Sequence, residues 1–285
     1  MSLRNPVKYP VKYYSWQDDQ APQLSNVDGA IKTILKACLV TGYGSKAGAG
    51  WTALFEDAYR IVLRRPLRTG NPPDIKIENG TISGSTKRHR IVAQDNPTGL
   101  GYTKELLAIN LLARDALAGT QWHCVVTDFA FFLCYQMAEN GFEGNRNMFL
   151  YWGEVSRTQE NIGNIHLITG STNTAVDGTQ SPWTYGFINN DGFFVKNIRT
   201  KTNLSRLYLD LGGTETAINN DYFAQLIFLD NVAVLPFYTA STSSINNNES
   251  LVVSIENRQM LRTISTGSQG LSSRAFYIPI DYWEL

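Results

Sequence analysis

The chain has 285 residues, 43% of them hydrophobic and 18% charged, a composition that excludes intrinsic disorder and fits a folded, β-leaning protein. Its 25 Lys and Arg residues balance its 25 Asp and Glu residues. The zero net charge excludes an overall attraction to nucleic acid or to an anionic membrane, and it leaves little repulsion between copies of the chain.

Residues 1–24 are predicted to form an extended arm. Prolines and alternating Lys and Tyr residues run through "MSLRNPVKYPVKYYSW", and the segment lacks the apolar core of a signal peptide. An arm of this kind lies either on a neighbouring subunit or on its own domain, and the sequence leaves both alternatives open. In the first case its aromatic side chains would be interface residues, namely Tyr13, Tyr14 and Trp16.

A helix is predicted immediately after the arm, within residues 25–39. Its apolar positions recur at the spacing of one helix face, and they are Val27, Ile31, Ile34, Leu35, Cys38 and Leu39. Ser25, with Asp28 three residues later, resembles a capping box at the start of this helix. Gly42 and Gly44 follow at the positions where a helix C-terminus favours left-handed backbone.

The stretch "VTGYGSKAGAGW" at residues 40–51 combines four glycines with a lysine. A phosphate-binding loop follows a strand and opens a helix, because the free N–H groups of that helix bind the phosphate. Here the glycines follow a helix, and Lys46 precedes Ala47 where a Walker motif has Ser or Thr. We therefore interpret the stretch as a helix stop and a flexible link, and no cofactor is predicted.

The rest of residues 25–120 predicts a small β region and a second helix. A strand is expected at Ala58–Leu63, and "DIKIENGTISG" predicts a hairpin with a type I′ turn at Asn79-Gly80. A further strand is expected from Lys87 to Asp95. Strong helix formers from Lys104 to Ala118 predict the second helix.

From residue 121 onward, runs of β-branched and aromatic residues alternate with turn residues, which predicts an antiparallel β-rich domain. Hairpin turns are expected near Asp128, Asp191 and Asp230. The predicted fold class is α+β, mostly β, with antiparallel, sandwich-like sheets, the N-terminal arm and one or two helices. The predicted divisions are residues 1–24, 25–120 and 121–285, with one continuous domain over 25–285 as the alternative.

The residues that could bind a metal or form a disulfide are few: Cys38, Cys124, Cys134, His89, His123 and His166. The cysteines are odd in number and lack close spacing, so they are predicted to be buried thiols. None of the histidines has a second ligand at metal-binding spacing, so no metal is predicted. The chain has no run of 18 apolar residues, so no membrane span is expected.

Carboxylates among aromatic residues could serve a glycosidase, and the candidates are Asp128, Glu143, Glu154 and Asp191. Two of them lie at predicted turns, where aspartate is expected because its side chain bonds to the backbone. Hydrolysis is therefore the least favoured hypothesis, and no catalytic residue is predicted. Glycan contact without catalysis, through Trp122 and Trp183, is a stronger alternative.

Three basic clusters are candidates for a DNA contact: Arg64-Arg65-Arg68, Lys87-Arg88-Arg90 and Arg199-Lys201-Arg206. In a neutral chain such clusters are usually solvated faces or ion pairs between subunits. If they lined the lumen of a ring, they could instead face the backbone of passing DNA.

Four segments carry a resemblance to a known family: "VKYYSWQDDQAPQLSNVDGAIKTILKACLVTGYGSK", then "GWTALFEDAYRIVLRR", then "WHCVVTDFAFFLCYQ" with "MFLYWGEV", and last "LSSRAFYIPI". In this order they resemble a family of uncharacterised structural proteins encoded by tailed phages and prophages. The matching positions include Tyr13-Tyr14, the run 38–45, Gly50-Trp51, Trp122 and Trp152-Gly153-Glu154. Relatives often insert a β-rich module after the run 38–45, whereas this chain continues directly to Trp51.

The resemblance implies a component of the virion, in the tail, baseplate or neck. Its partners would be copies of itself and other virion proteins, and the family supplies no catalytic residues to transfer. Because Tyr and Trp bury a large area with few rotors, Trp51 and Trp152 join the aromatic residues of the arm as predicted interface residues. A receptor- or glycan-binding appendage of the same particle is the alternative.

Overall fold

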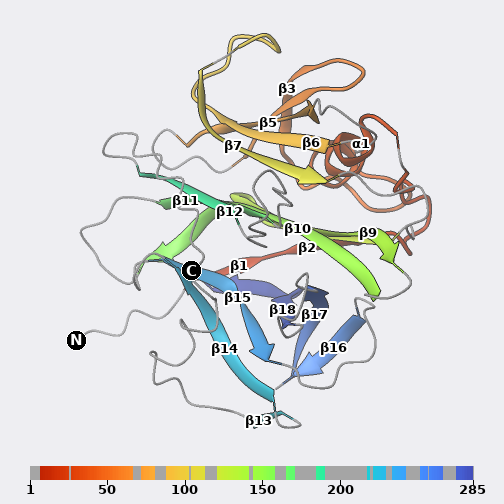
Figure 1. The fold of residues 1–285 in the computed structure, drawn as a ribbon, viewed down its shortest axis with the longest axis vertical. Helices are drawn as coiled ribbons and strands as arrows, with labels where there is room; N and C mark the ends of the chain where they lie inside the picture. The colour runs from red at the N-terminus through yellow and green to blue at the C-terminus, as the bar shows by residue number, and fades with distance from the viewer. Residues whose placement is uncertain are drawn as a thin grey trace.

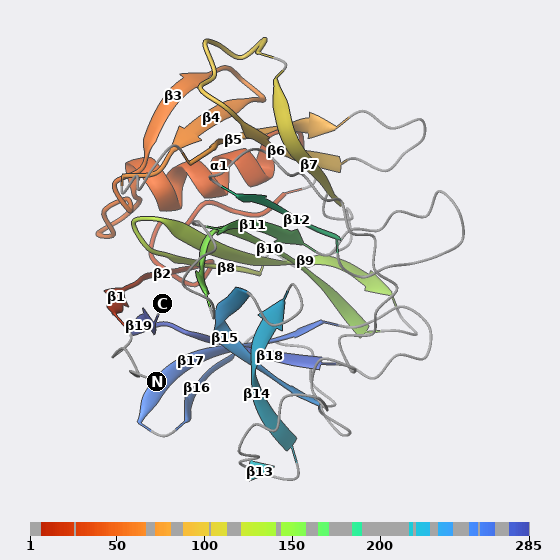
Figure 2. The ribbon, with the colours of Figure 1, turned by 90° about the vertical axis from the view of Figure 1, so that its left-hand side faces the viewer.

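The structure is a computed structural model that describes residues 7–25, 27–66, 72–80, 88–102, 104–112, 121–140, 144–157, 165–170, 184–189, 217–218, 221–228, 233–241, 251–255, 257–265 and 274–284. These residues form antiparallel sheets and one short helix, which confirms the predicted fold class. Three layers of strands are stacked on one another, with the helix between the upper two layers (Figure 1, Figure 2).

The upper layer is a sheet with the order β3-β4-β5-β6-β7. Its strands are β3 (Thr52–Glu56), β4 (Ile61–Arg64), β5 (Asp74–Gly80), β6 (Arg88–Gln94) and β7 (Glu105–Leu112). The middle layer runs in the order β2-β8-β9-β10-β11-β12. Its strands are β2 (Lys12–Ser15), β8 (Trp122–Val126), β9 (Ala130–Asn140), β10 (Gly144–Arg157), β11 (Ile165–Gly170) and β12 (Thr184–Asn189).

The lower layer follows the order β14-β15-β18-β17-β16, and the end of β10 joins it to the middle layer by pairing with β15. Its strands are β13 (Ala217–Ile218), β14 (Asp221–Phe228), β15 (Ala233–Ser241), β16 (Leu251–Ile255), β17 (Arg258–Ser265) and β18 (Arg274–Pro279). The two ends of the described chain meet, because β1 (Lys8–Pro10) pairs with β19 (Tyr282–Glu284).

Alternation along the strands divides the apolar residues between two cores. The upper core lies between the upper and middle sheets and encloses the helix; among its members are Tyr14, Ile34, Leu63, Ile77, Ile91, Trp122 and Leu133. The opposite face of the middle sheet packs on the lower layer, where Phe237 of β15 contacts Phe132 and Tyr151. β8, β9 and the part of β10 around Tyr151 are therefore apolar on both faces, as expected for strands covered on both sides.

The predicted first helix is confirmed as α1 (Ala30–Lys36), which continues into a π-helical turn, η1 (Ala37–Thr41). The predicted capping box is wrong, because the helix begins after Gly29 and no side chain caps it. Gly29 has a left-handed φ of 81°, and its N–H donates instead to Asn79 Oδ1 at 3.1 Å. A side chain of β5 thus accepts a hydrogen bond from a backbone N–H group at the start of the helix.

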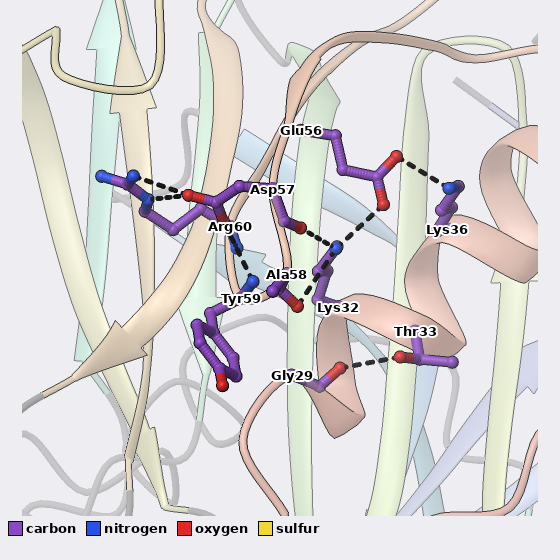
Figure 3. A network of polar contacts seen from close by, with 9 residues as sticks. All are labelled: Gly29, Lys32, Thr33, Lys36, Glu56, Asp57, Ala58, Tyr59 and Arg60. Atoms are coloured by element: carbon purple, nitrogen blue, oxygen red, sulfur yellow. Dashed lines mark hydrogen bonds and ion pairs between the residues drawn. The ribbon is translucent and has the colours of Figure 1, made fainter.

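A polar network ties α1 to the turn between β3 and β4 (Figure 3). Lys32 is largely buried and donates to the backbone oxygens of Asp57 and Ala58, and it pairs with Glu56 at 2.8 Å. Lys36 pairs with the second oxygen of Glu56 at 2.7 Å. Two lysines from one helix face therefore share one carboxylate, which fixes the orientation of the helix against the upper sheet.

The predicted second helix at Lys104–Ala118 is wrong where the structure describes it. Glu105–Leu112 form β7, which pairs with β6 along its whole length. Helix propensity is a weak preference, and an available strand edge overrides it. Leu107, Ile109 and Leu111 also alternate, so they fit a strand as well as a helix.

Two boundaries in the upper sheet also differ from the prediction. Asn79 and Gly80 lie inside β5, opposite His89 and Arg88, so the predicted turn residues are paired strand residues. The strand expected at Ala58–Leu63 begins later, at Ile61, because Asp57 Oδ1 accepts the N–H groups of Tyr59 and Arg60 and closes a bend there. The strand expected over Lys87–Asp95 is confirmed as β6.

The described part of the arm lies on its own chain. β2 pairs with β8, and β1 pairs with β19. The upper core extends from Tyr14 to Trp152 and so crosses both predicted divisions, at 24/25 and at 120/121. Within the described ranges, no helix has the length and apolarity needed to cross a membrane.

Candidate functional site

The arm docks along the edge of the middle sheet, and the residues that hold it form the arm-docking cluster: Tyr13, Tyr14, Asp18, Tyr43, Lys46, Trp122 and His123. β2 pairs with β8 in the register Tyr14 to Cys124 and Ser15 to His123. The pairing continues past the strand, because Trp16 N–H donates to Trp122 O at 3.0 Å. Strand alternation then sends Tyr13 and Tyr14 to opposite faces of the sheet.

Tyr14 enters the upper core and is only 1% exposed. Its hydroxyl donates to Ala47 O at 2.7 Å, so the buried polar end has a partner. Burial raises the pKa of Tyr14 well above its usual value. This residue is therefore a core anchor of the arm and is not available to another subunit.

The glycine stretch folds over the edge of β2 and supplies the polar part of the cluster. Lys46 Nζ donates to Tyr13 O at 2.9 Å and pairs with Asp18 at 2.7 Å. Tyr43 donates its hydroxyl to the other oxygen of Asp18 at 2.7 Å. Burial works against the charge of Asp18, but the hydrogen bonds from Lys46, Tyr43 and Ser15 N–H hold its pKa below the usual value.

The glycines are required by this close approach of backbone to backbone. A Cβ atom at Gly42 would lie 2.2 Å from Lys46 O, and one at Gly48 would lie 2.2 Å from Val40 O. A Cβ atom at Gly44 would lie 2.4 Å from Asp19 O. Gly42 and Gly44 also have positive φ angles of 74° and 52°, which favour glycine. Gly42, which ends η1, has ψ 179° and so does not adopt the left-handed helical conformation predicted for it. Residues 40–51 thus form a compact loop against the arm, the glycine clasp, in which Lys46 binds the Asp18 carboxylate and the Tyr13 carbonyl.

His123 of β8 lies on the lower face of the middle sheet, beside Tyr13 of the neighbouring strand β2. Tyr13 Oη and His123 Nδ1 are hydrogen-bonded at 2.8 Å, and the two rings are stacked. His123 Nε2 is buried and has no hydrogen-bond partner within the described residues. Burial lowers the pKa of His123 to about 4, and the nearby Asp18 carboxylate only partly opposes this. The imidazole is therefore neutral at pH 7.

The tryptophans expected at an interface or on a glycan lie inside the molecule. Trp51 and Trp152 are each 3% exposed, and Trp122 is fully buried with Nε1 donating to Pro22 O at 2.8 Å. The prediction of surface roles for these three residues is corrected by this burial. Tyr13 and Trp16 remain partly exposed, and Trp183 lies outside the described residues.

The carboxylates proposed for glycan chemistry are not brought together where they are described. Asp128 is exposed at the turn between β8 and β9, as expected for a turn aspartate. Glu154 pairs with Arg65 at 2.5 Å, and Arg65 also donates to Phe129 O at 3.1 Å. Glu143 and Asp191 lie outside the described residues. Glu154 therefore holds Arg65, and with it the segment that follows β4, against the middle sheet.

The basic clusters are partly neutralised within the chain. Arg64 makes two hydrogen bonds to Asp74, at 2.9 and 2.6 Å, and Arg90 pairs with Glu78 at 2.8 Å. Arg88 is described only as a backbone position in β6, while Arg68, Lys87 and the cluster Arg199-Lys201-Arg206 lie outside the described residues. The charges of Arg64, Arg65 and Arg90 thus take part in ion pairs within the chain.

All three cysteines are buried free thiols, as predicted. Cys38 of η1 contacts Cys124 of β8, and burial raises the pKa of the Cys38 thiol well above its usual value. Cys38 is therefore a packing residue between the helix and the sheet. Among the described residues, no group of three or more His, Cys, Asp or Glu side chains could hold a metal ion.

A second cluster, at the meeting of the two chain ends, was not predicted from the sequence. Tyr282 lies between two cations, with Lys8 Nζ 4.4 Å and the Arg258 guanidinium 4.0 Å from its ring centre. Arg258 also pairs with Asp281 at 2.9 Å. Only the alternation of Lys and Tyr in the arm hinted at it, because Lys8 and Tyr282 are 274 positions apart along the chain.

No family model, curated protein or solved structure matches the chain.

Several aromatic residues and one cysteine that are distant in sequence share one location. Tyr14, Cys38, Trp51, Trp122 and Trp152 are separated in sequence but belong to the same upper core. Apolar packing among these residues holds the arm, the glycine clasp and β8 together.

Proposed function

We propose that the protein is a structural subunit of a tailed-phage particle, in the tail, baseplate or neck, which assembles as a symmetric homo-oligomer. The observation that carries the proposal is the convergence of the motif residues on the arm-docking cluster and the core above it. Segments that resemble the phage family thus pack the arm, the helix and the middle sheet into one core.

The sheet architecture supports the same proposal. Three stacked layers present long antiparallel strands and their edges at the periphery of the molecule (Figure 2). A neutral chain allows copies to pack closely, because no net charge separates them. Most soluble assemblies of identical chains have closed symmetry, so we expect a discrete oligomer.

Immunogold labelling tests this proposal on the particle itself. Antibodies raised against the purified protein would be applied to particles induced from a lysogen that carries the chain. We expect gold at the tail, baseplate or neck of each particle. Label confined to unassembled protein, with particles bare, would overturn the proposal.

A further inference from the structure

Within the described part of the chain, most strand edges carry features that oppose the addition of another strand. An open edge exposes unpaired N–H and C=O groups, and proteins usually cover it or place charges, prolines or bulges there. The edge of β2 is covered by the glycine clasp, since Lys46 donates to Tyr13 O. β3 has a register shift between Ala53 and Phe55 and ends in the charged Glu56.

The remaining described edges are protected in similar ways. β1 contains Lys8 and Pro10, and Glu284 lies in its partner β19. β13 has only two residues, and β14 beside it begins with the charged Asp221 and has a register shift between Gln225 and Ile227. β12 lies against β7 of the upper sheet. These features oppose the addition of another strand.

β16 has none of these devices. Its sequence is Leu-Val-Val-Ser-Ile, without a charge or a proline, and it pairs with β17 without a register shift. Within the described part of the chain no strand pairs with its other side. Val252 is 47% exposed, which makes it one of the few large exposed apolar side chains described.

An apolar cluster lies beside this edge on the face of the sheet that carries Met260. Val253 and Ile255 of β16 are partly exposed and pack against Met260 and Tyr277 of the neighbouring strands. A second strand placed along β16 would extend the sheet and cover these side chains further.

We propose that β16 pairs with β16 of a second copy, antiparallel and about a two-fold axis. A second copy fits because the strand is uncharged, so the pairing sets no like charges opposite each other. With the axis at Val253, Val252 of one copy faces Ser254 of the other, and the two apolar clusters become continuous. This inference deepens the proposed self-assembly and rests on it only for the existence of an oligomer.

Single lysines at the edge test the pairing. Val252→Lys and Ser254→Lys place a charge on exposed positions of β16, and Val27→Lys is the matched control, since Val27 is 54% exposed and lies before α1. We expect each β16 variant to weaken self-association by about tenfold or more, with an unchanged far-UV spectrum, and the control to behave as the wild type.

The readouts are mass by light scattering across a dilution series and hydrogen exchange of the β16 amides. The amides that face the open edge are those of Val252 and Ser254, because alternate residues of β16 bond to β17. We expect these two amides to be protected wherever the wild type is oligomeric and to lose that protection only at dilutions at which the mass falls to that of the monomer. An oligomer that survives both β16 lysines, or that Val27→Lys disrupts equally, would overturn the β16 contact and leave self-assembly standing. A wild-type monomer at every concentration would overturn both.

Discussion

Tyr13 Oη lies 2.8 Å from His123 Nδ1, and the planes of the two rings differ by only 7°. The pair joins the arm to β8 on the lower face of the middle sheet, directly beside the Asp18 and Lys46 ion pair. Because the imidazole is buried and neutral, this contact makes the docking of the arm sensitive to acid.

Stability is expected to fall between pH 6.5 and 4. The pKa of His123 is lowered to about 4 in the folded chain, so the unfolded chain binds a proton over this window and the folded chain does not. The expected loss from this residue is about 1.4 kcal/mol per pH unit. Urea denaturation at several pH values measures it.

His123→Gln is the control for this pH dependence, since it removes the titrating group while His89 and His166 remain. The slope of stability against pH should be smaller in the variant over the same window. Equal slopes in the two proteins would show that His123 does not carry the effect.

Truncation of Tyr14 should destabilise the whole molecule. The side chain is 1% exposed in the upper core, so Tyr14→Ala leaves a large cavity and an unpaired Ala47 carbonyl. We expect a loss of about 3–5 kcal/mol in the free energy of unfolding. Tyr59→Ala is the matched comparison, because Tyr59 is 55% exposed, and similar losses in both variants would contradict the anchor role.

Removal of the arm should prevent correct folding. Deletion of residues 1–15 would uncover the edge of β8 and empty the position of Tyr14. We expect insoluble protein or a non-cooperative thermal transition, measured by circular dichroism. A deletion that ends at Pro6 removes no described contact and serves as the control. A cooperative, native-like transition after the longer deletion would show that the arm is dispensable for the fold.

Neutralising Glu154 should be costly. Its partner Arg65 has a side chain that is 2% exposed, so Glu154→Gln removes the negative charge that Glu154 places beside a buried guanidinium. We expect about 2–4 kcal/mol of destabilisation by chemical denaturation. Lys104→Gln, at an exposed ion pair with Asp95, should give no measurable change. A loss at Glu154 as small as that at Lys104 would contradict the structural role.

The thiols should be unreactive in the folded protein. Cys38, Cys124 and Cys134 are buried, and burial keeps the Cys38 thiol protonated. We expect reaction with an aromatic disulfide reagent to be slow in native buffer and to reach three thiols per chain in denaturant. Rapid native modification of any of the three would contradict the packing described.

The sequence predicted the character of the fold better than its pairing. The spacing of Ile31, Ile34 and Leu35 identified α1, and runs of β-branched and aromatic residues between turn residues identified β8 and β9. Residues 104–112 were misassigned because strong helix formers there also alternate, and only the nearby edge of β6 decides between the two patterns.

The sequence identified several residues of the site but not the role that each residue plays. Tyr14, Trp51 and Trp152 were selected as aromatic interface residues, but an aromatic side chain suits a core equally well. Contacts such as Lys46 to Asp18 or Arg65 to Glu154 depend on the register of distant strands, which local spacing does not encode.

The mass of the purified full-length protein in solution, by size-exclusion chromatography with light scattering, tests the central claim most directly. The account predicts a discrete multiple of the 31.9 kDa chain that persists over a range of concentrations. A single species at 31.9 kDa at every concentration would contradict self-assembly as a homo-oligomer.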